Sequence, residues 1–166
     1  MLIKGITDED FVNYKLPSMY IATATCSFKC DKEYGKPICQ NSELAKRPDI
    51  DVGIEYIVDR YMNNPITKAI VIGGLEPVDS GNELLWMINE FRRNTRDDIV
   101  IYTGYTKEEF ESAPYQSDLN TIWLGFQSFK NIVVKFGRYI PGQQPHYDPV
   151  LGVYLASDNQ YAERIS

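Results

Sequence analysis

The stretch AIVIGG at residues 69–74 indicates the class of fold. Its first four residues are apolar without alternation, which is typical of a strand buried on both faces of a parallel sheet. Two further apolar runs follow, IVIY at 99–102 and IVVKF at 132–136. Glycines come directly after the first and last run and shortly after the second, where a strand-to-helix turn is expected.

The segments between these runs carry helical signals. Residues 54, 57, 58 and 61 are apolar at helical spacing, with Asp51 expected to cap this helix and Pro65 to end it. A second helix is predicted from the apolar residues 84, 85, 88 and 91. Thr106 and Glu109 form a capping-box pattern that starts a third, shorter helix.

The ends of the chain complete the alternation. SMYIATAT at 18–25 is rich in β-forming residues and is predicted as the first strand, running straight into Cys26. VYL at 153–155 is predicted as a final strand. The order of elements predicts an α/β fold with a mostly parallel sheet, and a length of 166 residues suits one domain over residues 1–166.

The net charge and the lack of long apolar runs argue against two classes of partner, nucleic acids and membranes. With a formal net charge of -6, the chain repels phosphate backbones, so no nucleic-acid partner is expected. No apolar run approaches the ~18 residues of a membrane span, and no signal-peptide pattern opens the sequence. A cytoplasmic location without a membrane partner is therefore expected.

The cysteines are the strongest chemical clue. Cys26, Cys30 and Cys39 are the only 3 cysteines, and an odd, clustered set argues against a disulfide framework. Thiolates suit iron–sulfur clusters, zinc or copper, and three of them leave one metal position open. A Cys3His zinc site that uses His146, the sole histidine, is an alternative, as are cysteines without a shared role.

Strand order predicts where the site lies. The cysteine segment, about 26–48, is expected to be a long loop after the first strand, and the turns at 73–74, 102–104 and 136–138 follow later strands. Ligand sites of parallel α/β sheets lie beyond the carboxyl ends of the strands. These four segments are therefore expected to gather on one side of the sheet.

The sequence GGLEP at 73–77 adds a second chemical feature. Paired glycines let a ligand approach the backbone closely, and Glu76 offers a carboxylate to an ammonium group. Together with the three cysteines, this turn resembles the radical S-adenosylmethionine (SAM) superfamily. The resemblance implies a partial (β/α) barrel, a [4Fe-4S] cluster held by three cysteines, and a fourth iron that takes the amino and carboxylate groups of SAM.

Further segments resemble the activating enzyme of the anaerobic (class III) ribonucleotide reductase. They are CQN at 39–41, IYTGY at 101–105, GRY at 137–139 and LASDNQ at 155–160. The resemblance implies reductive cleavage of SAM to a 5′-deoxyadenosyl radical, which installs a glycyl radical on the reductase. The implied partners are the large subunit of that enzyme and an electron donor such as flavodoxin or ferredoxin.

The resemblance also assigns residues. It implies Cys26, Cys30 and Cys39 as cluster ligands. The residues that it places at SAM are Gly73, Gly74, Glu76, Asn41, Tyr102, Thr103 and Arg138. Each of the last four also has an ordinary structural interpretation: a turn former for Asn41, strand residues for Tyr102 and Thr103, and a salt-bridge partner for Arg138.

Three features depart from the family pattern. Eight residues separate Cys30 from Cys39 where the family has two, and the extra stretch from 31 to 38 is expected to loop out. Leu75 is inserted before Glu76, and Phe136 replaces an aspartate. The competing hypotheses are a radical SAM enzyme with another protein or small-molecule substrate, a zinc interaction module, and a relative that binds the cluster without catalysis.

Overall fold

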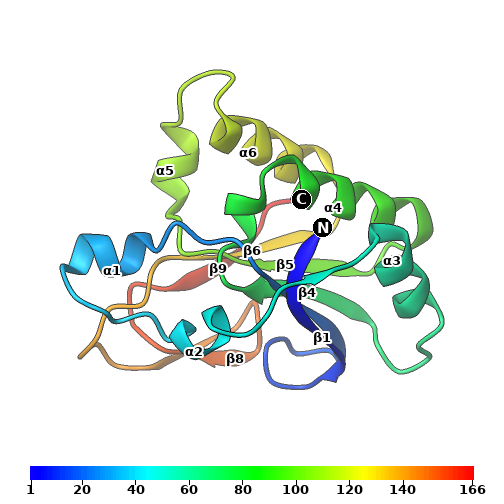
Figure 1. Cartoon of the computed structure of the whole chain (residues 1–166), viewed down its shortest axis with the longest axis horizontal. Helices are drawn as coiled ribbons and strands as arrows, with labels where there is room; N and C mark the ends of the chain where they lie inside the picture. Colours follow the sequence, from blue (N-terminus) through cyan, green and yellow to red (C-terminus); the bar gives the residue numbers. More distant parts are fainter.

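The computed structural model describes residues 1–166 and is built on a seven-stranded sheet (Figure 1). The strand order is β3-β1-β2-β4-β5-β6-β9. The strands of this sheet are β1 Leu2–Asp10, β2 Ser18–Thr23, β3 Ile50–Asp51, β4 Ala69–Gly74, β5 Asp98–Tyr102, β6 Ile132–Phe136 and β9 Tyr161–Arg164.

The middle of the sheet is parallel, as predicted. β2, β4, β5 and β6 run in one direction, and the α/β class is confirmed. β1, β3 and β9 add antiparallel pairs at the two sides. The strands predicted from buried apolar runs therefore form the centre of a mostly parallel sheet.

Helices cover one face of this sheet (Figure 1). α3, α4 and α6 lie there, and alternate strand residues such as Ile72, Ile101 and Val134 point into the same core cluster. Burial of these side chains is the main stabilising term. The helices are α1 Lys29–Tyr34, α2 Ser42–Ala45, α3 Ile54–Met62, α4 Asn82–Asn94, α5 Lys107–Glu111, α6 Asp118–Ser128 and the short 3₁₀ helix η1 Pro77–Ser80. No helix has both the length and the apolar character needed to cross a membrane.

The opposite face is covered by loops and a small hairpin. β7 (His146–Asp148) and β8 (Val153–Leu155) pair with each other in a separate two-stranded sheet. Leu151 and Leu155 from this region, with Tyr14, pack on the second set of alternate strand residues. The predicted strand at 153–155 therefore exists, but it does not join the main sheet, and the last strand of the chain is β9.

Several boundaries differ from the prediction. The first predicted strand ends at Thr23 rather than entering Cys26, and Asp51 pairs with Leu2 in β3 instead of capping a helix. α3 begins after Gly53 and ends at Met62, before Pro65 is reached. The cysteine segment is not one continuous loop, because α1 and α2 form within it.

Side-chain caps mark the first residues of two helices. The capping box of α5 is confirmed, since the Thr106 side chain accepts from Glu109 N and the Glu109 side chain accepts from Thr106 N. Helix α6 was not predicted from the sequence. Its start carries a similar signal, because the Ser117 side chain accepts a hydrogen bond from the backbone N–H of Asn120.

Candidate functional site

A hollow of about 330 Å³ lies beyond the carboxyl ends of the four parallel strands. The turns that were expected to gather on one side of the sheet do so around it. Nine of the ten residues assigned from the resemblance line this strand-end hollow: Cys26, Cys30, Cys39, Asn41, Gly74, Glu76, Tyr102, Thr103 and Arg138. Gly73 does not line it and lies one residue earlier, within β4.

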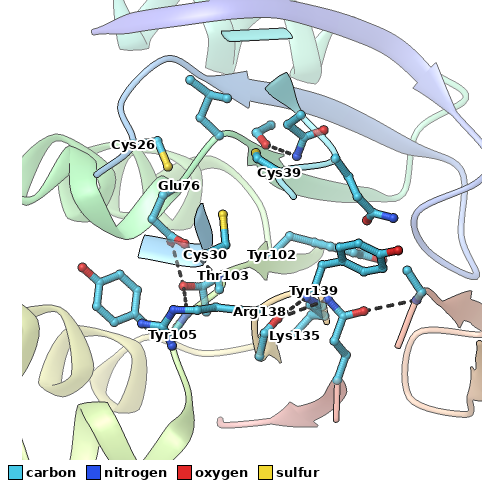
Figure 2. Close-up of a pocket in the computed structure, with 18 of the residues that line it drawn as sticks. Cys26, Cys30, Cys39, Glu76, Tyr102, Thr103, Tyr105, Lys135, Arg138 and Tyr139 are labelled. Atoms are coloured by element: carbon cyan, nitrogen blue, oxygen red, sulfur yellow. Dashed lines mark hydrogen bonds between the residues drawn. The ribbon is translucent and has the colours of Figure 1, made fainter. Parts of the chain in front are cut away.

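The three cysteines reach the hollow from different parts of the cysteine segment (Figure 2). Cys26 follows β2, Cys30 lies on α1, and Cys39 lies between α1 and α2. All three are free thiols and partly exposed. Burial raises the pKa of Cys26 to about 11. The pKa of Cys30 is also raised to about 11, mainly by burial and to a smaller extent by the neighbouring Cys39 and Asp31.

The glycine turn is held against the neighbouring strand and the cysteine segment. Gly74 has a φ of +87°, and a Cβ at this position would lie 2.7 Å from the Cα of Ala22 on β2. The side-chain amide of Asn41 donates to the carbonyl of Gly74 over 2.5 Å. Asn41 therefore ties the segment just after Cys39 to the end of β4.

Glu76 lies buried behind this turn, and the inserted Leu75 does not move it away from the hollow. Its carboxylate accepts hydrogen bonds from Thr103 Oγ1 (2.7 Å), Gly104 N (2.8 Å) and Val78 N (3.2 Å). Burial outweighs these donors and raises the pKa of Glu76 to about 7. The acidic turn and the YTGY segment are thus parts of one hydrogen-bonded unit.

Arg138 lines the hollow but is engaged in ion pairs. Its guanidinium donates two hydrogen bonds of 2.8 Å to the carboxylate of Glu109, and its Nε lies 3.3 Å from Glu33 on α1. Lys29, also on α1, lies 3.8 Å from Glu109. These four side chains form a charge clip between α1 and the scaffold, which matches the salt-bridge interpretation of Arg138. Its partners Glu109 and Glu33 were not predicted from the sequence.

The lining of the hollow includes a lysine that was not predicted as a site residue. Lys135 on β6 pairs in register with Tyr102 on β5, and both line the hollow. The Tyr102 hydroxyl donates to the carbonyl of Asn13 over 2.6 Å. Lys135 is 7% exposed, and the only hydrogen bond of its Nζ goes to the carbonyl of Gly137 at 2.7 Å. A lysine within the apolar run 132–136 was the available signal.

We predict that Lys135→Met stabilises the metal-free protein at pH 7 by about 2 kcal/mol. Burial lowers the pKa of Lys135 from 10.5 to about 8, so the folded protein holds this charge at a cost below pH 8. The wild-type protein regains stability between pH 8 and 10.5, where folding favours the neutral amine. The advantage of the variant should therefore shrink over that range. Gly137 keeps a donor, because Gln160 Nε2 also bonds its carbonyl.

Urea unfolding of both proteins at pH 7 and pH 10 measures this difference. Lys130→Met is the matched control, because that side chain is exposed and its replacement should change the free energy of unfolding by less than about 0.5 kcal/mol. A variant at Lys135 that is less stable than the wild type at pH 7 contradicts the prediction.

His146 does not join the cysteines. It lies on β7, it does not line the strand-end hollow, and its buried Nδ1 has no hydrogen-bond partner. No three His, Cys, Asp or Glu side chains are placed to hold a single metal ion. The structure therefore does not assemble the Cys3His set of the zinc alternative.

The thiols do suit a metal cluster. Each cysteine of a [4Fe-4S] cluster binds a different iron, so the sulfurs surround a volume rather than one atom. The three free cysteines line one hollow, as such a cluster requires. The Sγ of Cys26 also accepts the backbone N–H of Phe28 at 3.2 Å, which is the kind of contact that tunes a cluster-bound sulfur.

Residues 18–127 match the family described as a 4Fe-4S single cluster domain. The chain belongs to the 4Fe-4S single cluster domain family. The matched part of this 4Fe-4S domain contains all three cysteines, the glycine turn and the YTGY segment. Neither the curated proteins nor the solved structures that were searched gave a match to the 4Fe-4S domain.

Proposed function

We propose that this iron–sulfur protein is a radical SAM enzyme whose cluster ligands are Cys26, Cys30 and Cys39. Its mostly parallel sheet would then be the partial (β/α) barrel of that superfamily. The physiological reaction that we propose is installation of a glycyl radical on the large subunit of an anaerobic ribonucleotide reductase, with flavodoxin or ferredoxin as the electron donor.

One observation carries the proposal. The three free thiols and the turn formed by Gly74, Leu75 and Glu76 line the same hollow, although they come from separate segments of the chain. Three cysteines leave one iron of a [4Fe-4S] cluster without a protein ligand. Much of the remaining lining is made of polar groups and tyrosine rings, which suit a nucleoside attached to an amino acid.

The residues around the cysteines have distinct proposed roles. When reduced, a [4Fe-4S] cluster held by the three cysteines would supply one electron to the sulfonium of SAM, which would break the bond to C5′ and leave methionine and a 5′-deoxyadenosyl radical. The glycine turn lets the methionine end of SAM approach the backbone. Glu76 would accept a hydrogen bond from the ammonium group of SAM, and Thr103 and Gly104 hold the carboxylate of Glu76 in place.

The accessibility of the cysteines favours a protein substrate. None of the three cysteines is fully buried, so the side of the hollow that they form remains open to a large partner. An enzyme for a small metabolite usually encloses its substrate more completely. The alternatives are a small-molecule substrate and a different protein substrate. A test on the reductase subunit itself separates both from the activase role.

Anaerobic reconstitution with iron and sulfide, followed by dithionite and SAM, tests the chemistry. We expect cluster absorbance and the release of methionine and 5′-deoxyadenosine. The control is the same sample without dithionite, which should release neither product. A protein that binds the cluster but cleaves no SAM would refute the proposed enzyme activity.

Incubation with the large subunit of an anaerobic ribonucleotide reductase tests the substrate. We expect an electron paramagnetic resonance signal from a glycyl radical that requires SAM. SAM cleavage without this signal, on a subunit that a known activating enzyme does modify, would refute the activase role and favour another substrate.

A further inference from the structure

The eight residues between Cys30 and Cys39 have a defined path. Cys30 lies on α1, which ends at Tyr34 and is followed by Gly35 in a left-handed conformation with a φ of +76°. The N–H of Gly35 donates to the carbonyl of Asp31 at 2.9 Å, and the chain then turns back. The stretch was not predicted to contain a helix, yet residues 31–34 belong to α1 and only residues 35–38 form a loop. This short loop must return Cys39 to the hollow.

The Asp31 side chain makes that return contact. Its Oδ1 accepts the backbone N–H groups of both Ile38 (2.8 Å) and Cys39 (2.9 Å). The same oxygen lies 3.9 Å from the Sγ of Cys30. One carboxylate oxygen therefore contacts both ends of the long spacing.

We infer that Asp31 is a positioning residue that brings Cys30 and Cys39 together as cluster ligands and lowers the reduction potential of the bound cluster. The inference rests on the proposed ligand set, but it does not require SAM cleavage or any particular substrate. It explains how a chain with eight intervening residues can present the same pair of thiols as a chain with a short spacing.

The positioning argument follows from chain entropy. An open loop of this length samples many separations between its ends, and closing it costs conformational entropy. Hydrogen bonds from two consecutive N–H groups to a charged acceptor are stronger than neutral ones and restrict that sampling. The loop is then already ordered in the metal-free protein, with Cys39 in position to bind the cluster.

The effect on potential follows from charge. Reduction adds an electron to the cluster, and a carboxylate close to a ligand sulfur opposes that addition. The two N–H donors offset part of this charge but do not remove it. Asp31→Asn keeps a carbonyl oxygen that can accept the same hydrogen bonds, whereas Asp31→Ala loses both the oxygen and the charge. The two variants therefore separate positioning from electrostatics.

The first measurement is amide hydrogen exchange of Ile38 and Cys39 in the metal-free protein. We expect Asp31→Ala to exchange these two amides at least tenfold faster than the wild type, and Asp31→Asn to stay within about threefold. Glu43→Gln is the matched control, because this exposed carboxylate on α2 pairs only with Lys46. Unchanged exchange in Asp31→Ala, or equal acceleration in both variants, would overturn the positioning role.

The second measurement is iron content and reduction potential after reconstitution. We expect Asp31→Ala to retain less than half of the wild-type iron. Asp31→Asn should retain nearly all of it, with a potential shifted to a more positive value. Full iron content in Asp31→Ala overturns the positioning role, and an unshifted or more negative potential in Asp31→Asn overturns the effect on potential. A wild-type protein that takes up no cluster would refute the proposed ligand set instead, independently of the exchange result.

Discussion

Replacing Cys39 by alanine is expected to abolish cluster incorporation while leaving the fold intact. Cys39 supplies one of only three thiols in the chain, and the rest of the hollow offers no cysteine to replace it. Its side chain is outside both core clusters, so its loss creates no core cavity. Iron and sulfide content per chain should fall below about a tenth of the wild-type value. The free energy of unfolding of the metal-free protein should change by less than about 1 kcal/mol.

The control for this experiment is Ser42→Ala, which changes an exposed side chain in the same segment without removing a thiol. It should retain the wild-type iron content. Chemical analysis of iron and sulfide, the cluster absorbance and a urea unfolding curve of the metal-free protein provide the measurements. A Cys39→Ala protein that keeps its full cluster would remove Cys39 from the ligand set.

Replacing Gly74 by alanine is expected to cost about 3 kcal/mol of folding free energy, the largest stability effect that we predict. The left-handed backbone at Gly74 disfavours any side chain. The added Cβ would also lie 2.7 Å from Ala22 Cα and 2.9 Å from Thr23 N. These neighbours belong to the paired strand β2, so the crowding cannot be relieved by rotating a side chain. The two strands would have to separate at the end that leads into the cysteine segment.

Gly142→Ala provides the comparison for Gly74→Ala. Gly142 has a similar φ of +85°, but a Cβ there would meet nothing within 4 Å. Its replacement should cost only the backbone term of about 1 kcal/mol. Urea unfolding of the metal-free proteins measures both values. Equal losses in the two variants would show that crowding against β2 contributes nothing, contrary to our expectation.

The sequence predicted the centre of the fold better than its edges. Strands such as β4 and β6 are buried along their whole length, so their residues form apolar runs that are recognisable in isolation. β1 is an antiparallel strand with mixed burial, and charged residues interrupt any regular pattern. The position of β8 depends on pairing with β7 rather than on its own composition. Pairing of this kind is a tertiary property that a local pattern does not contain.

The candidate site shows the same division. The turns at the strand ends could be placed around one hollow because parallel strands end on the same side of a sheet. The partner of Arg138 could not be predicted, because Glu109 is distant in the sequence and is brought near only by the fold. The role of Asp31 was hidden for another reason. A carboxylate next to a cysteine has no recognisable pattern until the path of the loop is known.

The charge clip differs in kind from another contact that holds the cysteine segment. At the Cys39 end, Asn41 and Gly74 join through a neutral amide and a carbonyl. At the Cys30 end, partly exposed Lys29 and Glu33 face Glu109 and Arg138. Dissolved salt weakens attraction between exposed charges but has little effect on a neutral hydrogen bond. A rise in ionic strength therefore weakens mainly the Cys30 end of the segment. As salt is added, α1 should detach from the strand-end hollow before the Cys39 end does.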